Sequence, residues 1–283
     1  MDLDFTGPAR DEHAGKSSVA LNCFRNLGSA VEIAAGSTFF TEGQASDRMY
    51  MLLEGEVALS REGKSLDIVR AEEIFGEMAA ITGQPRTATA TARNACKALT
   101  LDAQQFQQAV QANPEFALVL MGIMNNRLRL TVALMGRSRS IAEAGAREGA
   151  RVFDRKMLDD LAAAMRVRPS QTYPAGRSVM KEGEPGVSMY IVMRGKVAVT
   201  IKGAGSIEPV VVERIGSGGV FGEMALVDQS PRAASAAAEE ESLLLAISRN
   251  DFLAQVKTRP DFAVSLLKAV SERLRRMTAQ KSK

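Results

Sequence analysis

The segment FGEMALVDQSPRAASA occupies residues 221–236, and a near copy, FGEMAAITGQPRTATA, occupies residues 75–90. In both segments a glycine before helix-forming residues predicts a tight turn followed by a short helix. The first N–H groups of a helix attract anions, and an arginine returning across the next loop offers a two-pronged donor to phosphate oxygens. A carboxylate only accepts hydrogen bonds, so the glutamate indicates a ligand hydroxyl close to that phosphate.

The repeat extends well beyond these two segments. Residues 36–60 match residues 176–200 at an offset of 140, for example Tyr50 with Tyr190. From the quoted segments onward the offset is 146, and it still holds at Arg127 and Arg273. The second copy therefore contains six additional residues between 200 and 221. Glycine, serine and proline in this stretch predict a longer surface hairpin.

Each copy begins with short apolar runs separated by glycine turns, which is typical of a small antiparallel sandwich or barrel. A stripe with helical spacing follows in each copy. We therefore predict an α+β, mainly β chain of two tandem β-roll (jelly-roll-like) domains, each with flanking N- and C-terminal helices, joined by a helical connector. The apolar stripes consist of Ala117, Leu120, Met121, Met124 and Leu128, and of Ala263, Leu266, Leu267, Val270, Leu274 and Met277. The predicted boundaries are a disordered tail (1–20), domain 1 (21–136), the connector (137–169) and domain 2 (170–283).

Composition excludes several classes of function. The 36 basic and 33 acidic residues nearly balance, which does not favour a nucleic-acid binder. No apolar run approaches 18 residues, so no membrane span is expected, and the polar start does not look like a signal peptide. Two cysteines form no disulfide framework and fit a reducing cytoplasm. The single histidine, His13, falls in the predicted tail, which argues against a Ser–His–Asp triad and a histidine-bound metal. Catalysis without histidine is possible, but we do not expect this chain to be an enzyme.

A 3′,5′-cyclic nucleotide meets the requirement of one hydroxyl beside one phosphate, because its free ribose hydroxyl is the 2′-OH. The two quoted segments resemble the phosphate-binding cassette of the cyclic nucleotide-binding domain, the family of the catabolite activator protein, protein kinase A regulatory subunits and cyclic-nucleotide-gated channels. The resemblance covers roughly 28–135 and 170–278. It implies that Glu77 and Glu223 hold the 2′-OH and that Arg86 and Arg232 hold the cyclic phosphate. It further implies a C-terminal lid helix over the base, and backbone amides that complete each cradle, from Gly76, Met78, Thr87, Gly222, Met224 and Ala233.

The chain departs from the family pattern at two positions, and neither change touches the cradle. One is Val187, which in the second copy replaces the acidic turn residue that Asp47 supplies in the first. The family carries a glycine three residues before the phenylalanine; the second copy has Gly218 there, and the first has Glu72. A positive φ at Glu72 would cost about 1 kcal/mol. By resemblance, a threonine after the arginine bonds guanine and an alanine accompanies adenine. Thr87 and Ala233 then suggest cAMP at site 2 and a less selective site 1, open to cGMP; equally, threonine is simply a good strand residue.

These features predict a stand-alone cyclic nucleotide receptor with no cofactor, whose output is a contact with an unknown protein partner. The chain ends within about ten residues of the last lid helix, so no DNA-binding domain is expected, and the N-terminal tail lacks an inhibitory Arg-Arg-x-Ser/Thr segment. The expected mechanism is a population shift in which the helix 261–277 caps the base and re-presents an apolar stripe or the connector. The alternatives are an oligomerising or scaffold protein with one or both sites degenerate and, less favoured, an enzyme acting on cyclic nucleotides. A homodimer is left open.

Overall fold

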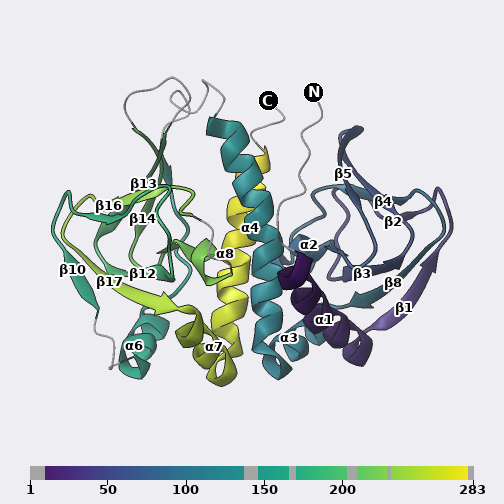
Figure 1. The fold of residues 1–283 in the computed structure, drawn as a ribbon, viewed down its shortest axis with the longest axis horizontal. Coiled ribbons are helices and arrows are strands. Elements are labelled where there is room, and N and C mark those ends of the chain that lie inside the picture. Colours follow the sequence, from purple (N-terminus) through teal and green to yellow (C-terminus); the bar gives the residue numbers. More distant parts are fainter. Residues whose placement is uncertain (1–9, 137–145, 166–169, 203–208, 228–230, 280–283) are drawn as a thin grey trace. The chain divides into compact units, whose positions relative to one another are not determined.

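The computed structural model describes residues 10–136, 146–165, 170–202, 209–227 and 231–279. The chain divides into two compact units, Met1–Val119 and Leu120–Lys283. Within each unit the strands lie in two layers, with helices alongside (Figure 1). This arrangement confirms the mainly β class and the two tandem β-rolls. The domain boundaries given above stay a prediction.

The first unit is a pair of four-stranded sheets, ordered β1-β8-β3-β6 and β2-β7-β4-β5. All of its strand pairs are antiparallel. The long helix α4 runs across the division between the units. The elements are α1 (Arg10–Leu27), β1 (Ser29–Ile33), β2 (Thr38–Phe40), β3 (Met49–Glu54), β4 (Val57–Arg61), β5 (Lys64–Val69), β6 (Ile74–Phe75), α2 (Glu77–Thr82), β7 (Thr89–Ala92), β8 (Cys96–Leu101), α3 (Ala103–Ala112) and α4 (Pro114–Gly136).

The core of the first unit lies between its two sheets. Leu52 and Phe75 from one sheet pack in a single buried cluster with Val57 and Ala90 from the other. Residues of both sheets contribute to this one cluster, so one face of each sheet is directed inward. The register is therefore fixed, because a one-residue slip would expose this apolar face.

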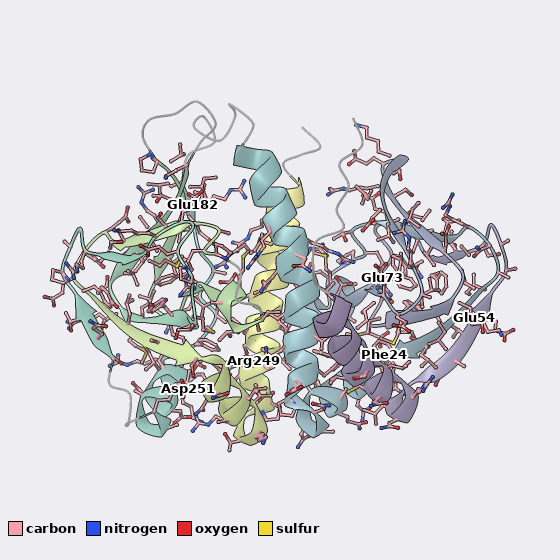
Figure 2. The ribbon with its side chains drawn as sticks, viewed as in Figure 1. Phe24, Glu54, Glu73, Glu182, Arg249 and Asp251 are labelled. Atoms are coloured by element: carbon pink, nitrogen blue, oxygen red, sulfur yellow. The ribbon has the colours of Figure 1, made fainter. Side chains whose placement is uncertain are left out.

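Helix α1 begins at Arg10, inside the segment 1–20 that the sequence predicts as a disordered tail. That prediction was wrong from Arg10 onward, while residues 1–9 and the side chain of His13 lie outside what the structure describes. The physical reason is packing: Ala20 and Phe24 lie one helical turn apart and are buried. The ring of Phe24 meets Phe116 edge-on at 6.1 Å between centroids (Figure 2).

The second unit repeats this arrangement of two sheets, and one of its sheets has a fifth strand, β9. Its sheets are ordered β10-β17-β12-β15 and β11-β16-β13-β14-β9. The hairpin β13–β14 carries the predicted insertion, whose tip, 203–208, lies outside the described residues. The elements are β9 (Arg147–Glu148), α6 (Arg155–Ala164), β10 (Gln171–Tyr173), β11 (Ser178–Met180), β12 (Ser188–Arg194), β13 (Lys196–Lys202), β14 (Pro209–Gly216), β15 (Val220–Phe221), the 3₁₀ helix η1 (Glu223–Leu226), β16 (Ser235–Ala238), β17 (Ser242–Ser248), α7 (Arg249–Thr258) and α8 (Pro260–Ala279).

The connector predicted as helical over 137–169 is only partly so. Helix α6 confirms one stretch, and 137–145 and 166–169 fall outside the described residues. Arg147 and Glu148 instead form β9, which pairs parallel with β14 opposite Glu213 and Arg214. This backbone pairing with β14 replaces the helix that the local composition favours.

Residues 149–153 anchor β9 to the second unit. The N–H groups of Val152 and Phe153 both donate to the carbonyl of Gly218, at 2.9 Å each. The buried ring of Phe153 stacks on Phe262 of α8, with 5.2 Å between centroids. Residues 149–153 are therefore part of the packed second unit, and Phe153 contacts its C-terminal helix.

Two general expectations can be compared with the structure. Both cysteines, Cys23 and Cys96, are buried free thiols, and burial raises the pKa of each above its ordinary value. Within the described ranges, no helix is long and apolar enough to cross a membrane, and no cluster of His, Cys, Asp and Glu could hold a metal ion.

Candidate functional site

A left-handed glycine begins each cassette. Gly76, at φ 73°, precedes α2, and Gly222, at φ 72°, precedes η1. The predicted turn and short helix are therefore confirmed in both copies. A Cβ on Gly76 would lie 2.7 Å from Nη1 of Arg86, and one on Gly222 would lie 2.8 Å from Nη1 of Arg232. Glycine is thus needed twice over, for the backbone conformation and for the close approach of the arginine.

The loop that returns each arginine is fixed by the turn after the second strand. In the first unit the N–H of Arg86 donates to the carbonyl of Gln44, and its carbonyl accepts from Gly43, both at 2.9 Å. In the second unit Arg232 makes the same pair of bonds with Glu184 and Gly183. The repeated Glu-Gly turns therefore position the arginines, although the sequence pattern alone does not assign them that role.

Arg86 is enclosed by protein acceptors and aromatic rings. Its Nη1 donates to the carbonyl of Gly76 at 2.6 Å, and its Nη2 donates to Ser46 Oγ at 2.5 Å and to the carbonyl of Arg48 at 2.7 Å. The guanidinium carbon lies 3.9 Å from the ring centroid of Phe40, which is cation–π geometry. The residue is 3% exposed, and burial lowers the pKa of its guanidinium. Its buried Nε has no hydrogen-bond partner among the described residues.

Arg232 occupies the equivalent place with fewer contacts. Its Nη1 donates to the carbonyl of Gly222 at 3.0 Å, and its Nη2 donates to the carbonyl of Ser188 at 2.8 Å. The guanidinium carbon lies 5.9 Å from the ring centroid of Tyr190. The residue is half-buried, and burial again lowers its pKa.

Glu223 is buried and pairs with an arginine that the sequence analysis did not assign to the site. Nη1 of Arg273, on α8, lies 2.8 Å from Oε1 of Glu223, and its Nε lies 3.1 Å from Oε2 of Glu213. Its Nη2 donates to the carbonyl of Val220 at 2.9 Å. Burial alone would lower the pKa of Arg273, but the two carboxylates together raise it. The sequence did contain a sign that Arg273 matters, because the repeat has an arginine, Arg127, at the equivalent position of the first copy.

The remaining predicted residues lie at equivalent positions in the two units. Met78 and Met224 are the second residues of α2 and η1, where backbone N–H groups have no partner within the helix. Thr87 and Ala233 directly follow the arginines, two residues before β7 and β16. Glu77 is fully buried at the start of α2. The structure therefore brings each predicted set of five residues together on a glycine turn, a short helix and a returning loop.

Two further details concern the residues around the cassettes. The φ of Glu72 is 70°, and that of its counterpart Gly218 is 82°, so the positive φ anticipated for Glu72 is confirmed. In the second unit Arg249, the first residue of α7, donates to the carbonyl of Leu226 at 3.2 Å, at the end of η1 (Figure 2).

A family profile described as the cyclic nucleotide-binding domain matches residues 30–113 and 170–259. The chain belongs to the cyclic nucleotide-binding domain family. It carries two copies of that domain, and both matched ranges contain the glycine, glutamate and arginine described above. The resemblance inferred from the two cassettes is thereby confirmed.

Three relatives illustrate the range of this family. The chain is 26% identical over 219 residues to the cGMP-dependent protein kinase egl-4 of Caenorhabditis elegans, covering 77% of this chain and 25% of that protein. It is 26% identical over 218 residues to the cAMP-dependent protein kinase regulatory subunit of Yarrowia lipolytica, covering 77% of this chain and 51% of that one. The solved catabolite activator protein of Thermus thermophilus is 31% identical, over 44% of this chain and 58% of that one, with a TM-score of 0.40. The chain thus spans between a quarter and about half of these two curated kinase-related proteins.

Proposed function

We propose that this chain is a cyclic nucleotide receptor with one site in each unit, and that it acts by binding rather than by catalysis. The observation that supports this most is the state of Arg86. A guanidinium that is 3% exposed carries a buried Nε without a partner in the described part of the chain. Leaving a buried charged donor unsatisfied is costly, and a phosphate oxygen would satisfy it.

The rest of each cassette suits the same ligand. In site 1, Gly76, Glu77, Met78, Arg86 and Thr87 would surround the cyclic phosphate and the 2′-OH. In site 2, the same roles fall to Gly222, Glu223, Met224, Arg232 and Ala233. The glutamates favour a hydroxyl donor, and the arginines with the first N–H groups of the short helices favour an anion. The proposed ligands are cAMP, and cGMP in addition at site 1.

The output is proposed to pass through α8. Arg273 connects this helix to Glu223, so a ligand hydroxyl that bonds Glu223 alters the partner of Arg273. Phe153 stacks on Phe262 of the same helix, which links α8 to the segment between the repeats. A shift in the population of α8 positions would therefore reach that segment and, through it, a protein partner. Two unpaired buried cysteines support placing the receptor in a reducing compartment such as the cytoplasm.

The alternative is an oligomerising or scaffold protein in which one or both cassettes no longer bind nucleotide. Site 1 gives this alternative its one specific support, because protein acceptors already take three of the N–H bonds of Arg86. A scaffold would keep its partner contacts whether or not cyclic nucleotide is present.

Amide hydrogen exchange on the full chain separates the two proposals. With cAMP, the wild type should gain protection in the cassettes and show altered exchange in α8. The R86A/R232A double variant should show neither change, because each phosphate loses its charged donor. Unchanged exchange in the wild type at millimolar cAMP and cGMP would contradict the receptor and favour the scaffold. As a control for folding, the double variant should unfold cooperatively at a temperature close to that of the wild type.

A further inference from the structure

The two arginines proposed to bind phosphate are held differently, and their surroundings outside the cassettes differ at three aligned pairs: Ser46 and Gly186, Asp47 and Val187, and Phe40 and Met180. The repeat aligns Ser46 with Gly186, at the 140-residue offset. Both residues lie in the turn that precedes the central strand, β3 in the first unit and β12 in the second. The turn sequences are QASDRM in the first copy and EPGVSM in the second.

Ser46 adds a hydrogen bond that the second unit lacks. Nη1 of each arginine donates to the carbonyl of its cassette glycine, and Nη2 of each donates to another backbone carbonyl, that of Arg48 or of Ser188. In the first unit Nη2 also donates to Ser46 Oγ at 2.5 Å. Both N–H bonds of that nitrogen are then taken by protein acceptors.

Gly186 is necessary for the different position of Arg232. A Cβ at residue 186 would lie 2.2 Å from Nε and 2.3 Å from Cζ of Arg232, closer than any side chain tolerates. The position therefore decides where the guanidinium lies, and a serine there excludes the arrangement seen in the second unit. Phe40 reinforces the difference, because it lies against Arg86 at 3.9 Å, whereas its counterpart in the repeat is Met180.

The donor inventory gives this difference a consequence. A two-pronged contact with phosphate uses two N–H bonds on one edge of the guanidinium, and each such edge includes Nη2. In Arg232 one Nη2 N–H is not engaged by any described residue, and the side chain is half-buried. In Arg86 both are engaged, so a phosphate must displace an existing acceptor, and the serine hydroxyl is the weaker of the two.

We propose that Ser46 lowers the affinity of site 1 for cyclic nucleotide, because its hydroxyl competes with the phosphate for Nη2 of Arg86. Site 2 then binds cyclic nucleotide more tightly, because Gly186 has no side chain that could compete for Arg232. This inference rests on the proposed receptor function.

Calorimetric titration of the full chain with cAMP tests the proposal, with R232A as the background that isolates site 1. S46A and S46G should each tighten cAMP binding by about tenfold, because one charge-assisted hydrogen bond no longer competes. S46T, which keeps the hydroxyl, should stay within about threefold of the parent. In the R86A background, G186S should weaken site 2 by about tenfold.

Unchanged or weakened binding in both S46A and S46G would overturn the proposal. S46A retains the Cβ and removes only the hydroxyl, so it keeps the test valid if G186S fails to fold. Binding by the wild type together with unchanged Ser46 variants would refute this inference alone. Absence of cAMP binding by the wild type, R86A and R232A would refute the receptor function, and with it the inference. Binding in R232A that appears only after S46A is added would support the proposal in its strongest form.

Discussion

Thr87 and Ala233 occupy the same position of the two cassettes, directly after the arginine. The threonine side chain carries a hydroxyl that can form a hydrogen bond, and the alanine side chain carries no polar group. In the R232A background, T87A should weaken cGMP relative to cAMP by about fivefold, because a neutral hydrogen bond contributes about 1 kcal/mol. T87S, which retains the hydroxyl, is the matched control. Competition of each nucleotide against labelled cAMP measures the ratio.

In the R86A background, A233T should raise the affinity of site 2 for cGMP by a similar factor. Identical cAMP-to-cGMP ratios for Thr87 and its alanine variant would mean that Thr87 serves only the backbone that leads into β7.

At the scale of single residues, the cassette pattern places all five residues of each predicted set within 16 consecutive positions, and their role in binding stays a prediction. Ser46 could not be predicted in this way, because it reaches Arg86 from 40 residues away. Its effect depends on the position of a guanidinium, which no sequence spacing specifies. An alignment of the two copies shows that Ser46 and Gly186 differ, but it does not show that either residue contacts the arginine.

At the scale of elements, α8 is joined to site 2 through one cation. R273M would leave Glu213 and Glu223 facing each other in a mostly buried place, so it should lower the free energy of unfolding of the second unit by about 3 kcal/mol. Urea denaturation measures the loss. R276M, at an exposed position on the same helix, is the matched control and should change stability by less than about 0.5 kcal/mol.

The connector shows where element prediction from sequence reaches its limit. Alanine, arginine and glutamate are good helix formers, and α6 follows that preference. Arg147 and Glu148 do not, because Glu213 and Arg214 on β14 offer backbone pairing. Those partners are more than 60 residues away, so local composition carries no sign of them. The same reason applies to α1, whose first residues form a helix that packs through Phe24.

At the scale of the whole chain, duplication is the feature that the sequence specifies most completely. The change of offset from 140 to 146 predicts an insertion in the second copy, and the longer β13–β14 hairpin lies at that place. Duplication also supplies internal controls, since each substitution in one cassette has a counterpart in the other. Both cassettes keep the same glycine, glutamate and arginine, which favours two sites of one kind, and the surroundings of the arginine differ at Ser46 and Gly186, which favours different affinities.

The number of cyclic nucleotides bound per chain tests the central claim most directly. Calorimetric titration with cAMP should give two sites in the wild type, one in R86A, one in R232A and none in the double variant, with site 2 the tighter of the pair. A wild type that binds no cyclic nucleotide, or a double variant that binds as the wild type does, would contradict the account.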